Sequence, residues 1–252
     1  MDNTIISFIL TLLAGLSTLF GMVIIFIFKK TNYKVISFSL SFAAGVMVSI
    51  SFTDLIPESI EMLKSKLQNF PLFLIVLILI TIGILLSIFI DKLFPSANNT
   101  QSRLYQVGLI SMIAIIIHNI PEGIITFLSA NTKLSLGLSI AIAIALHNIP
   151  EGMSIAVPIY YSTKNKKLTF SYTFLSAISE PFGAVLAYLF LKSYINNTIL
   201  GILFAITAGI MLHISFYELL PTSMSYNNKK ITYVAFLFGF LFMYFTRNLL
   251  SI

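Results

Sequence analysis

Two copies of one hexapeptide carry the residues best suited to chemistry in this 252-residue chain. The sequence His-Asn-Ile-Pro-Glu-Gly stands at residues 118–123 and again at residues 147–152. In an α-helix, residues four apart lie on one face, so each copy presents its histidine and its glutamate together. Imidazole and carboxylate groups are ligands of zinc and of other first-row divalent cations. Two such helices facing each other would direct four ligands to one point: His118, Glu122, His147 and Glu151.

Prolines next to glutamates add a second chemical feature. Pro121 and Pro150 have no N–H, so each frees a backbone carbonyl from the hydrogen-bond ladder of its helix. Such a carbonyl at membrane depth needs a partner, which a cation or a water molecule can supply. Pro181, directly after Glu180, repeats the arrangement in the next apolar segment. Three such steps in three consecutive segments favour a site over simple helix kinks.

Carboxylates are also unusually frequent inside apolar segments. Each ionisable group at the centre of a membrane helix costs about 2.5–3.5 kcal/mol on insertion scales. The basic residues stand almost entirely at segment ends, so we expect a bound cation or protons to compensate the carboxylates. Asn119 and Asn148, one residue after each histidine, could line an adjacent site that shares the same glutamates. The intramembrane carboxylates are Asp54, Glu122, Glu151, Glu180 and Glu218.

The composition places these residues in a membrane. Hydrophobic residues make up 58% of the chain and charged residues 10%, whereas a soluble domain carries about 25% charged residues. The lack of cysteine excludes a disulfide scaffold, and scattered lysine and arginine argue against a nucleic-acid partner. We predict an all-α integral membrane protein, a single domain over residues 1–252 in contact with the lipid bilayer. Its eight transmembrane helices are expected at about 4–28, 34–57, 71–94, 104–128, 136–160, 169–191, 199–222 and 231–250.

A second internal match predicts how these helices are arranged. Residues 44–59 and 208–223 share nine of sixteen positions and place Asp54 opposite Glu218. Segment two therefore pairs with segment seven, as segment four pairs with segment five through the hexapeptide. Each pair joins an odd and an even segment, so the partners run in opposite directions. This pattern predicts a 3+2+3 inverted repeat, typical of transporters whose substrate site lies near the membrane midplane.

The distribution of basic residues predicts the orientation of the chain. Ten lysines and arginines fall in loops on one side and five on the side that holds both termini. Because cytoplasmic loops carry the excess of positive charge, both termini are expected outside the cytosol. A multi-pass protein of a bacterial cytoplasmic membrane is the natural setting.

The hexapeptides, the Glu180-Pro181 step and the paired Ala-Gly-x-Met…Pro segments resemble the ZIP family of divalent metal transporters, particularly its bacterial ZupT-like branch. The resemblance extends over the whole chain. It implies import of Zn²⁺ foremost, and of Fe²⁺, Mn²⁺ or Co²⁺, through a two-site centre between helices four, five and six. The family often carries a histidine-rich loop between helices three and four, but residues 94–103 contain no histidine.

The resemblance also implies roles for particular residues. Met47 would be a further ligand beside the two His/Glu pairs. Asn119, Asn148 and Glu180 would form the neighbouring site, which shares the glutamates of both hexapeptides. Helices one, four, five and six would move against helices two, three, seven and eight. The pathway would then be lined by Asp54 and Glu218, and His213 fits either this pathway or an interior packing role.

We interpret the chain as a secondary carrier that works by alternating access. An intramembrane metalloenzyme is the alternative from another class, but the HExxH order of a zinc hydrolase is absent. A cation channel would not need two symmetric sets of strong ligands. We therefore expect neither an enzyme nor a cofactor other than the transported cation. The choice among Zn²⁺, Fe²⁺, Mn²⁺, Co²⁺ and Cd²⁺ stays open, and so does a homodimer, because no GxxxG face stands out.

Overall fold

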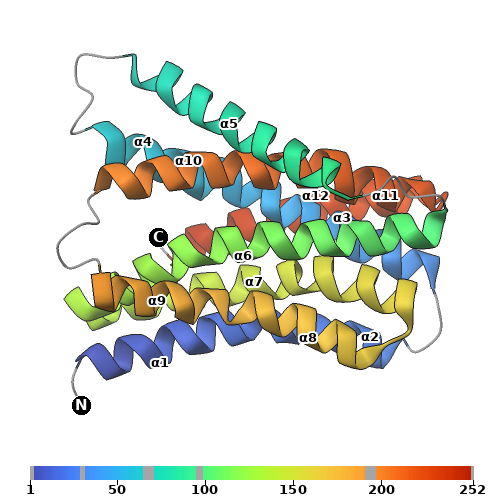
Figure 1. The fold of residues 1–252 in the computed structure, drawn as a ribbon, viewed down its shortest axis with the longest axis horizontal. Helices are drawn as coiled ribbons and strands as arrows, with labels where there is room; N and C mark the ends of the chain where they lie inside the picture. The colour runs from blue at the N-terminus through green and yellow to red at the C-terminus, as the bar shows by residue number, and fades with distance from the viewer. Residues whose placement is uncertain (1–2, 29–31, 65–70, 95–98, 191–196, 251–252) are drawn as a thin grey trace.

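A computed structural model describes the chain except for residues 1–2, 29–31, 65–70, 95–98, 191–196 and 251–252. The described residues are almost entirely helical, and the long helices lie side by side in one bundle (Figure 1). Both ends of the chain lie at the same end of this bundle, which we call the terminal end (Figure 1). Seven helical stretches are long and apolar enough to cross a membrane: Asn3–Ile27, Tyr33–Lys64, Leu72–Lys92, Thr100–Thr132, Leu134–Thr163, Asn197–Ser225 and Lys229–Leu249.

The sixth predicted segment is helical but broken. It forms α8 (Lys166–Ala177) and α9 (Ser179–Phe190), which are separated at Ile178. The two helices follow one another along the bundle (Figure 1), so the described residues hold this broken segment in addition to the seven membrane-crossing stretches. The all-α membrane architecture predicted from the apolar segments is therefore confirmed. Because of this break a new helix, α9, begins at Ser179, and Glu180 lies in its first turn.

Residues 44–59 and 208–223 form a second repeat, which we call the longer repeat. Each copy contains a π-helical turn at the same place. The second segment runs through α3 (Tyr33–Ile50), a π turn at Ser51–Leu55 and α4 (Ile56–Lys64). The seventh runs through α10 (Asn197–His213), a π turn at Ile214–Leu219 and α11 (Leu220–Ser225). A proline follows each π turn, and the wider turn accommodates a residue that cannot continue the hydrogen-bond ladder. The predicted end of the second helix at residue 57 was wrong for this reason, since the helix continues past Pro57 to Lys64.

The other helices follow the apolar pattern closely. The first segment is interrupted by a 3₁₀ stretch, whereas the third, fourth, fifth and eighth are single helices. Most apolar side chains of α5 and α12 face outward, as expected for helices in contact with lipid. The remaining elements are α1 (Asn3–Leu16), the 3₁₀ stretch (Ser17–Met22), α2 (Val23–Ile27), α5 (Leu72–Lys92), α6 (Thr100–Thr132), α7 (Leu134–Thr163) and α12 (Lys229–Leu250).

The helices pack in two groups. The first group consists of α1, α6, α7, α8 and α9, with the 3₁₀ stretch of the first segment packed against α7. The second group consists of α3, α4, α5, α10, α11 and α12, in which α3 packs most closely against α12 and α5 against α10. The main contact between the groups is that of α3 with α7. The division places both hexapeptides on one group and both copies of the longer repeat on the other.

Candidate metal centre

The two hexapeptides meet where α6 packs against α7. His118 Nε2 lies 3.1 Å from Glu122 Oε1 and 3.5 Å from Glu151 Oε1. His147 Nε2 lies 3.0 Å from the same oxygen of Glu122. All four side chains are buried. The contact of His147 with Glu122 is a hydrogen bond. Ligand atoms of a tetrahedral zinc ion, each about 2.0–2.1 Å from the metal, lie about 3.4 Å apart, so small side-chain shifts would fit these atoms around one ion.

Three of these residues form the tightest group. One ligand atom from each of His118, Glu122 and His147 lies within 4.8 Å of the others. The two histidines come from equivalent positions of antiparallel neighbours, and their rings are 6.3 Å apart between centroids. Helical spacing within α6 and the packing of α6 against α7 are therefore enough to bring these three side chains together.

A second set of acceptors lies beside this group. Asn148 Nδ2 donates hydrogen bonds to Glu180 Oε2 at 2.8 Å and to the Ala14 carbonyl at 2.9 Å. Asn119 Nδ2 donates to the Ser176 carbonyl at 3.4 Å. Both amides thus use their donors on the protein and keep their oxygens free. Among the described residues of this centre, the acceptor oxygens without a hydrogen-bond partner are Oδ1 of Asn119 and Asn148, Oε2 of Glu122, both carboxylate oxygens of Glu151 and Oε1 of Glu180.

Three ring nitrogens, Nδ1 and Nε2 of His118 and Nδ1 of His147, also lack a hydrogen-bond partner, so the unpartnered atoms of the centre are oxygens and imidazole nitrogens. Buried polar groups are normally satisfied, and a buried carboxylate without a counter-charge is costly. Within the described part of the chain, no lysine or arginine forms an ion pair with these glutamates. The centre is therefore built to receive positive charge.

Glycines bring the neighbouring helices close enough to complete the centre. A Cβ atom at Gly123 would overlap the backbone of Glu180, so only glycine lets α9 approach α6 at this height. A Cβ at Gly152 would overlap the backbone of Thr18 in the 3₁₀ stretch of the first segment. Glu180 lies in the first turn of α9, where the helix dipole favours a carboxylate. The last residue of each hexapeptide is thus a packing residue.

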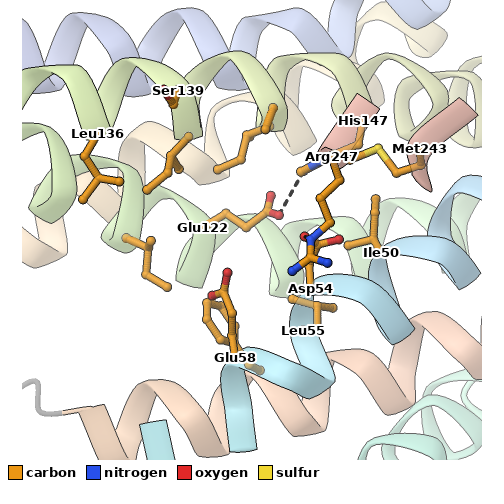
Figure 2. Close-up of a pocket in the computed structure, with 15 residues that line it drawn as sticks. Ile50, Asp54, Leu55, Glu58, Glu122, Leu136, Ser139, His147, Met243 and Arg247 are labelled. Carbon is orange, nitrogen blue, oxygen red and sulfur yellow. Dashed lines mark hydrogen bonds and ion pairs between the residues drawn. The ribbon is translucent and has the colours of Figure 1, made fainter. Parts of the chain in front are cut away.

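A cavity of about 420 Å³ joins the centre to the terminal end. Glu122 and His147 lie at its inner limit (Figure 2). The rest is lined by residues of α3, the π turn at Ser51–Leu55, α4, α6, α7, α10 and α12. Most of the lining is apolar. The polar side chains between the centre and the opening are Asp54, Glu58, Ser139 and Arg247.

The remaining predicted residues lie elsewhere. Glu218 forms an ion pair with Arg103 at 3.0 Å, near the end of the bundle opposite the terminal end. His213 Nδ1 is 2.9 Å from Ser87 Oγ in the same half. Met47 is fully buried in the main hydrophobic cluster, so its role as a ligand stays a prediction.

Sequence reasoning was wrong about the counter-charges of two carboxylates. Arg247 Nε lies 2.7 Å from Asp54 Oδ1, and Arg103 reaches Glu218. Both arginines lie within a few residues of a helix end, but their long side chains extend along the helix into the bundle. Position along the segment alone gave no signal for this, because it does not report how far a side chain reaches.

Comparison with known proteins agrees with the geometry. A family model described as ZIP Zinc transporter matches residues 2–105 and 96–247. The chain is 40% identical to a zinc transporter ZupT of Oceanobacillus iheyensis, over 96% of this chain and 97% of that protein. It is 40% identical to a zinc transporter ZupT of Streptococcus mutans over 94% of each chain. A zinc transporter ZupT of Chlorobium phaeovibrioides is 39% identical over the full length of both chains.

Proposed function

Because the chain belongs to the ZIP zinc transporter family, we propose that it imports Zn²⁺ and related divalent cations into the cytosol by alternating access. It is a multi-pass membrane protein of a transporter family and not an enzyme. The observation that supports the proposal is the buried His/Glu/His group beside a row of unpartnered acceptor oxygens. Zinc is the leading substrate, while Fe²⁺, Mn²⁺, Co²⁺ and Cd²⁺ suit the same ligand types.

The cavity indicates the direction from which the cation arrives. With both termini outside the cytosol, as the distribution of lysine and arginine predicts, the cavity opens to the outside. An arriving cation exchanges water for His118, Glu122, His147 and Glu151. Asn119, Asn148 and Glu180 offer the neighbouring position, with Glu122 and Glu151 shared between the two.

Release requires the centre to reach the other side. All the ligands of the proposed centre except Met47 lie on the first group of helices, whereas Asp54 and Glu218 lie on the second group. A movement of the first group against the second would carry the bound cation from the open end toward Glu218 and Arg103. Protonation of ligands on the cytosolic side assists release, because imidazole and carboxylate must be deprotonated to bind metal.

The test is zinc uptake into proteoliposomes by the wild type, Glu122→Gln and Glu151→Gln. We expect saturable uptake at micromolar zinc in the wild type and at least about a tenfold loss in both variants, because each removes a charged ligand. Glu61→Gln is the matched control, since Glu61 is an exposed glutamate of α4 outside the cavity.

Two outcomes would contradict the proposal. A wild type that binds zinc but moves none would mark the centre as structural or catalytic. Uptake that rises linearly with zinc concentration would indicate a channel. Circular dichroism and gel filtration of each variant separate a lost ligand from a lost fold.

A further inference from the structure

The cavity that leads to the metal centre contains a cation of the protein itself. Arg247, on the last turns of α12, extends into the cavity and meets Asp54 from the π turn of the second segment (Figure 2). The guanidinium is charged at every physiological pH. A divalent cation on its way to Glu122 must therefore pass a fixed positive charge, which the carrier mechanism by itself does not require.

The contacts of Asp54 show how this charge is held. Oδ1 faces Arg247 Nε at 2.7 Å, and Oδ2 lies 2.5 Å from the hydroxyl of Thr53. Both carboxylate oxygens are thus occupied. The side chains of Arg247 and Asp54 are 31% and 20% exposed, so water reaches the pair and it can exchange partners.

Glu58 provides the contrast within the same cavity. It lies one turn after Asp54, also lines the cavity, and forms no ion pair with any described residue. A cation that enters first meets the free carboxylate of Glu58 and then a carboxylate that Arg247 already neutralises. Arg247 and Asp54 both belong to the second group of helices, so the pair stays together when the groups move.

We propose that Arg247 is a tethered counter-ion that an arriving divalent cation must displace from Asp54, and that it thereby sets the entrance affinity and disfavours monovalent cations. The inference rests on the proposed transport function. A divalent ion is attracted to a carboxylate twice as strongly as a monovalent ion at the same distance. A free K⁺ or Na⁺ ion has the same charge as the guanidinium but lacks its tether, so it does not displace it.

The test separates KM from kcat for zinc uptake in proteoliposomes. Arg247→Gln should lower KM by about threefold or more, because it removes a positive charge from the path, and should leave kcat within about twofold. Arg247→Lys keeps the charge and should retain the wild-type KM within about twofold. Asp54→Asn leaves Arg247 unpaired in the path and should raise KM, whereas the double variant Asp54→Asn/Arg247→Gln should return toward the wild type.

Lys133→Gln is the matched control, because Lys133 is an exposed cation at the terminal end that does not line the cavity. It should leave KM unchanged, which separates the effect of Arg247 from a general change in surface charge. A second readout is competition by K⁺, with ionic strength held constant by N-methylglucamine. K⁺ should inhibit Arg247→Gln and not the wild type.

A folded Arg247→Gln variant with unchanged KM and no new sensitivity to K⁺ would overturn the inference. So would an equal fall in KM for Lys133→Gln. If the wild type itself takes up no zinc, the proposed function fails instead. Calorimetric zinc binding to the detergent-solubilised Arg247 and Lys133 variants then tests the tethered counter-ion separately, and equal affinities would overturn it.

Discussion

Asp54 and Glu218 occupy equivalent positions in the two copies of the longer repeat, yet their surroundings differ. Each lies in a π-helical turn, and each pairs with an arginine. Asp54 lines the cavity and is 20% exposed at its side chain, whereas the side chain of Glu218 is 2% exposed. The two copies therefore share one backbone conformation, and the helices packed around each copy determine how exposed its carboxylate is.

The arginines explain part of this difference. Arg247 comes from the same group of helices as Asp54, but Arg103 comes from α6, in the group opposite to that of Glu218. The pair of Glu218 thus joins the two groups. A hydrogen bond from Gln106 Nε2 to Asp91 Oδ1, at 3.1 Å, joins α6 to α5 nearby. These two contacts link the groups at the end opposite the cavity.

The largest expected effect comes from breaking the buried pair. Arg103→Gln leaves Glu218 buried without its counter-charge, so we expect the free energy of unfolding to fall by about 2 kcal/mol, which is less than for a fully buried pair because water reaches Arg103. Arg247→Gln, at the partly exposed pair in the cavity, should lower the free energy of unfolding by about 1 kcal/mol or less. Unfolding in SDS titrations, followed by circular dichroism, measures both.

The double variant Arg103→Gln/Glu218→Gln is the control for this prediction. It removes both charges and should recover most of the loss. Equal losses of unfolding free energy in Arg103→Gln and Arg247→Gln would contradict the expected difference between the pair of the buried Glu218 and the pair that lines the cavity.

The next effect concerns access of water to the two halves. The chain has no cysteine, so a single introduced cysteine reports on its own position. Ser139→Cys lies in the cavity, whereas Ser111→Cys lies on α6 between Arg103 and His118, where Ser111 is fully buried. A charged thiol reagent should label the cavity position at least about ten times faster, because the buried position reacts only after a local opening.

The wild type, which has no thiol, sets the background of this labelling experiment. Similar rates at the two positions in folded protein would show that the closed end is as accessible as the cavity.

The smallest expected effect concerns one serine hydrogen bond in each of the two π turns. Ser51 Oγ donates to the Met47 carbonyl at 2.8 Å, and Ser215 Oγ donates to the Met211 carbonyl at 2.8 Å. Ser51→Ala and Ser215→Ala should each cost about 1 kcal/mol and differ by less than about 0.5 kcal/mol. The same unfolding experiment checks this. A large difference would mean that the two π turns are not energetically equivalent.

How well the sequence predicted each feature depended on how far apart in the sequence the interacting residues lie. The pairing of His118 with Glu122 depends on helical spacing and could be read directly from the sequence. The contacts of His147 with Glu122 and of His118 with Glu151 run between α6 and α7, so they depend on how these helices pack. The broken sixth segment carries a signal in Pro181, which cannot bond the Ala177 carbonyl. Because Pro121 and Pro150 lie inside unbroken helices, proline alone did not predict the break. The extension of the second helix past Pro57 depended on a π turn, which has no simple sequence signal.

The helical membrane architecture, the doubled His/Glu element and the inverted repeat could all be derived from the sequence alone. Periodicity, hydrophobic length and internal identity are local properties, so one chain contains them in full. The packing of the helices was needed to show that Arg247 lines the cavity, that Arg103 pairs with Glu218, and that the cavity extends from the centre toward the terminal end. These features join residues that are far apart in sequence, and their outcome depends on which helices pack together and how far long side chains reach.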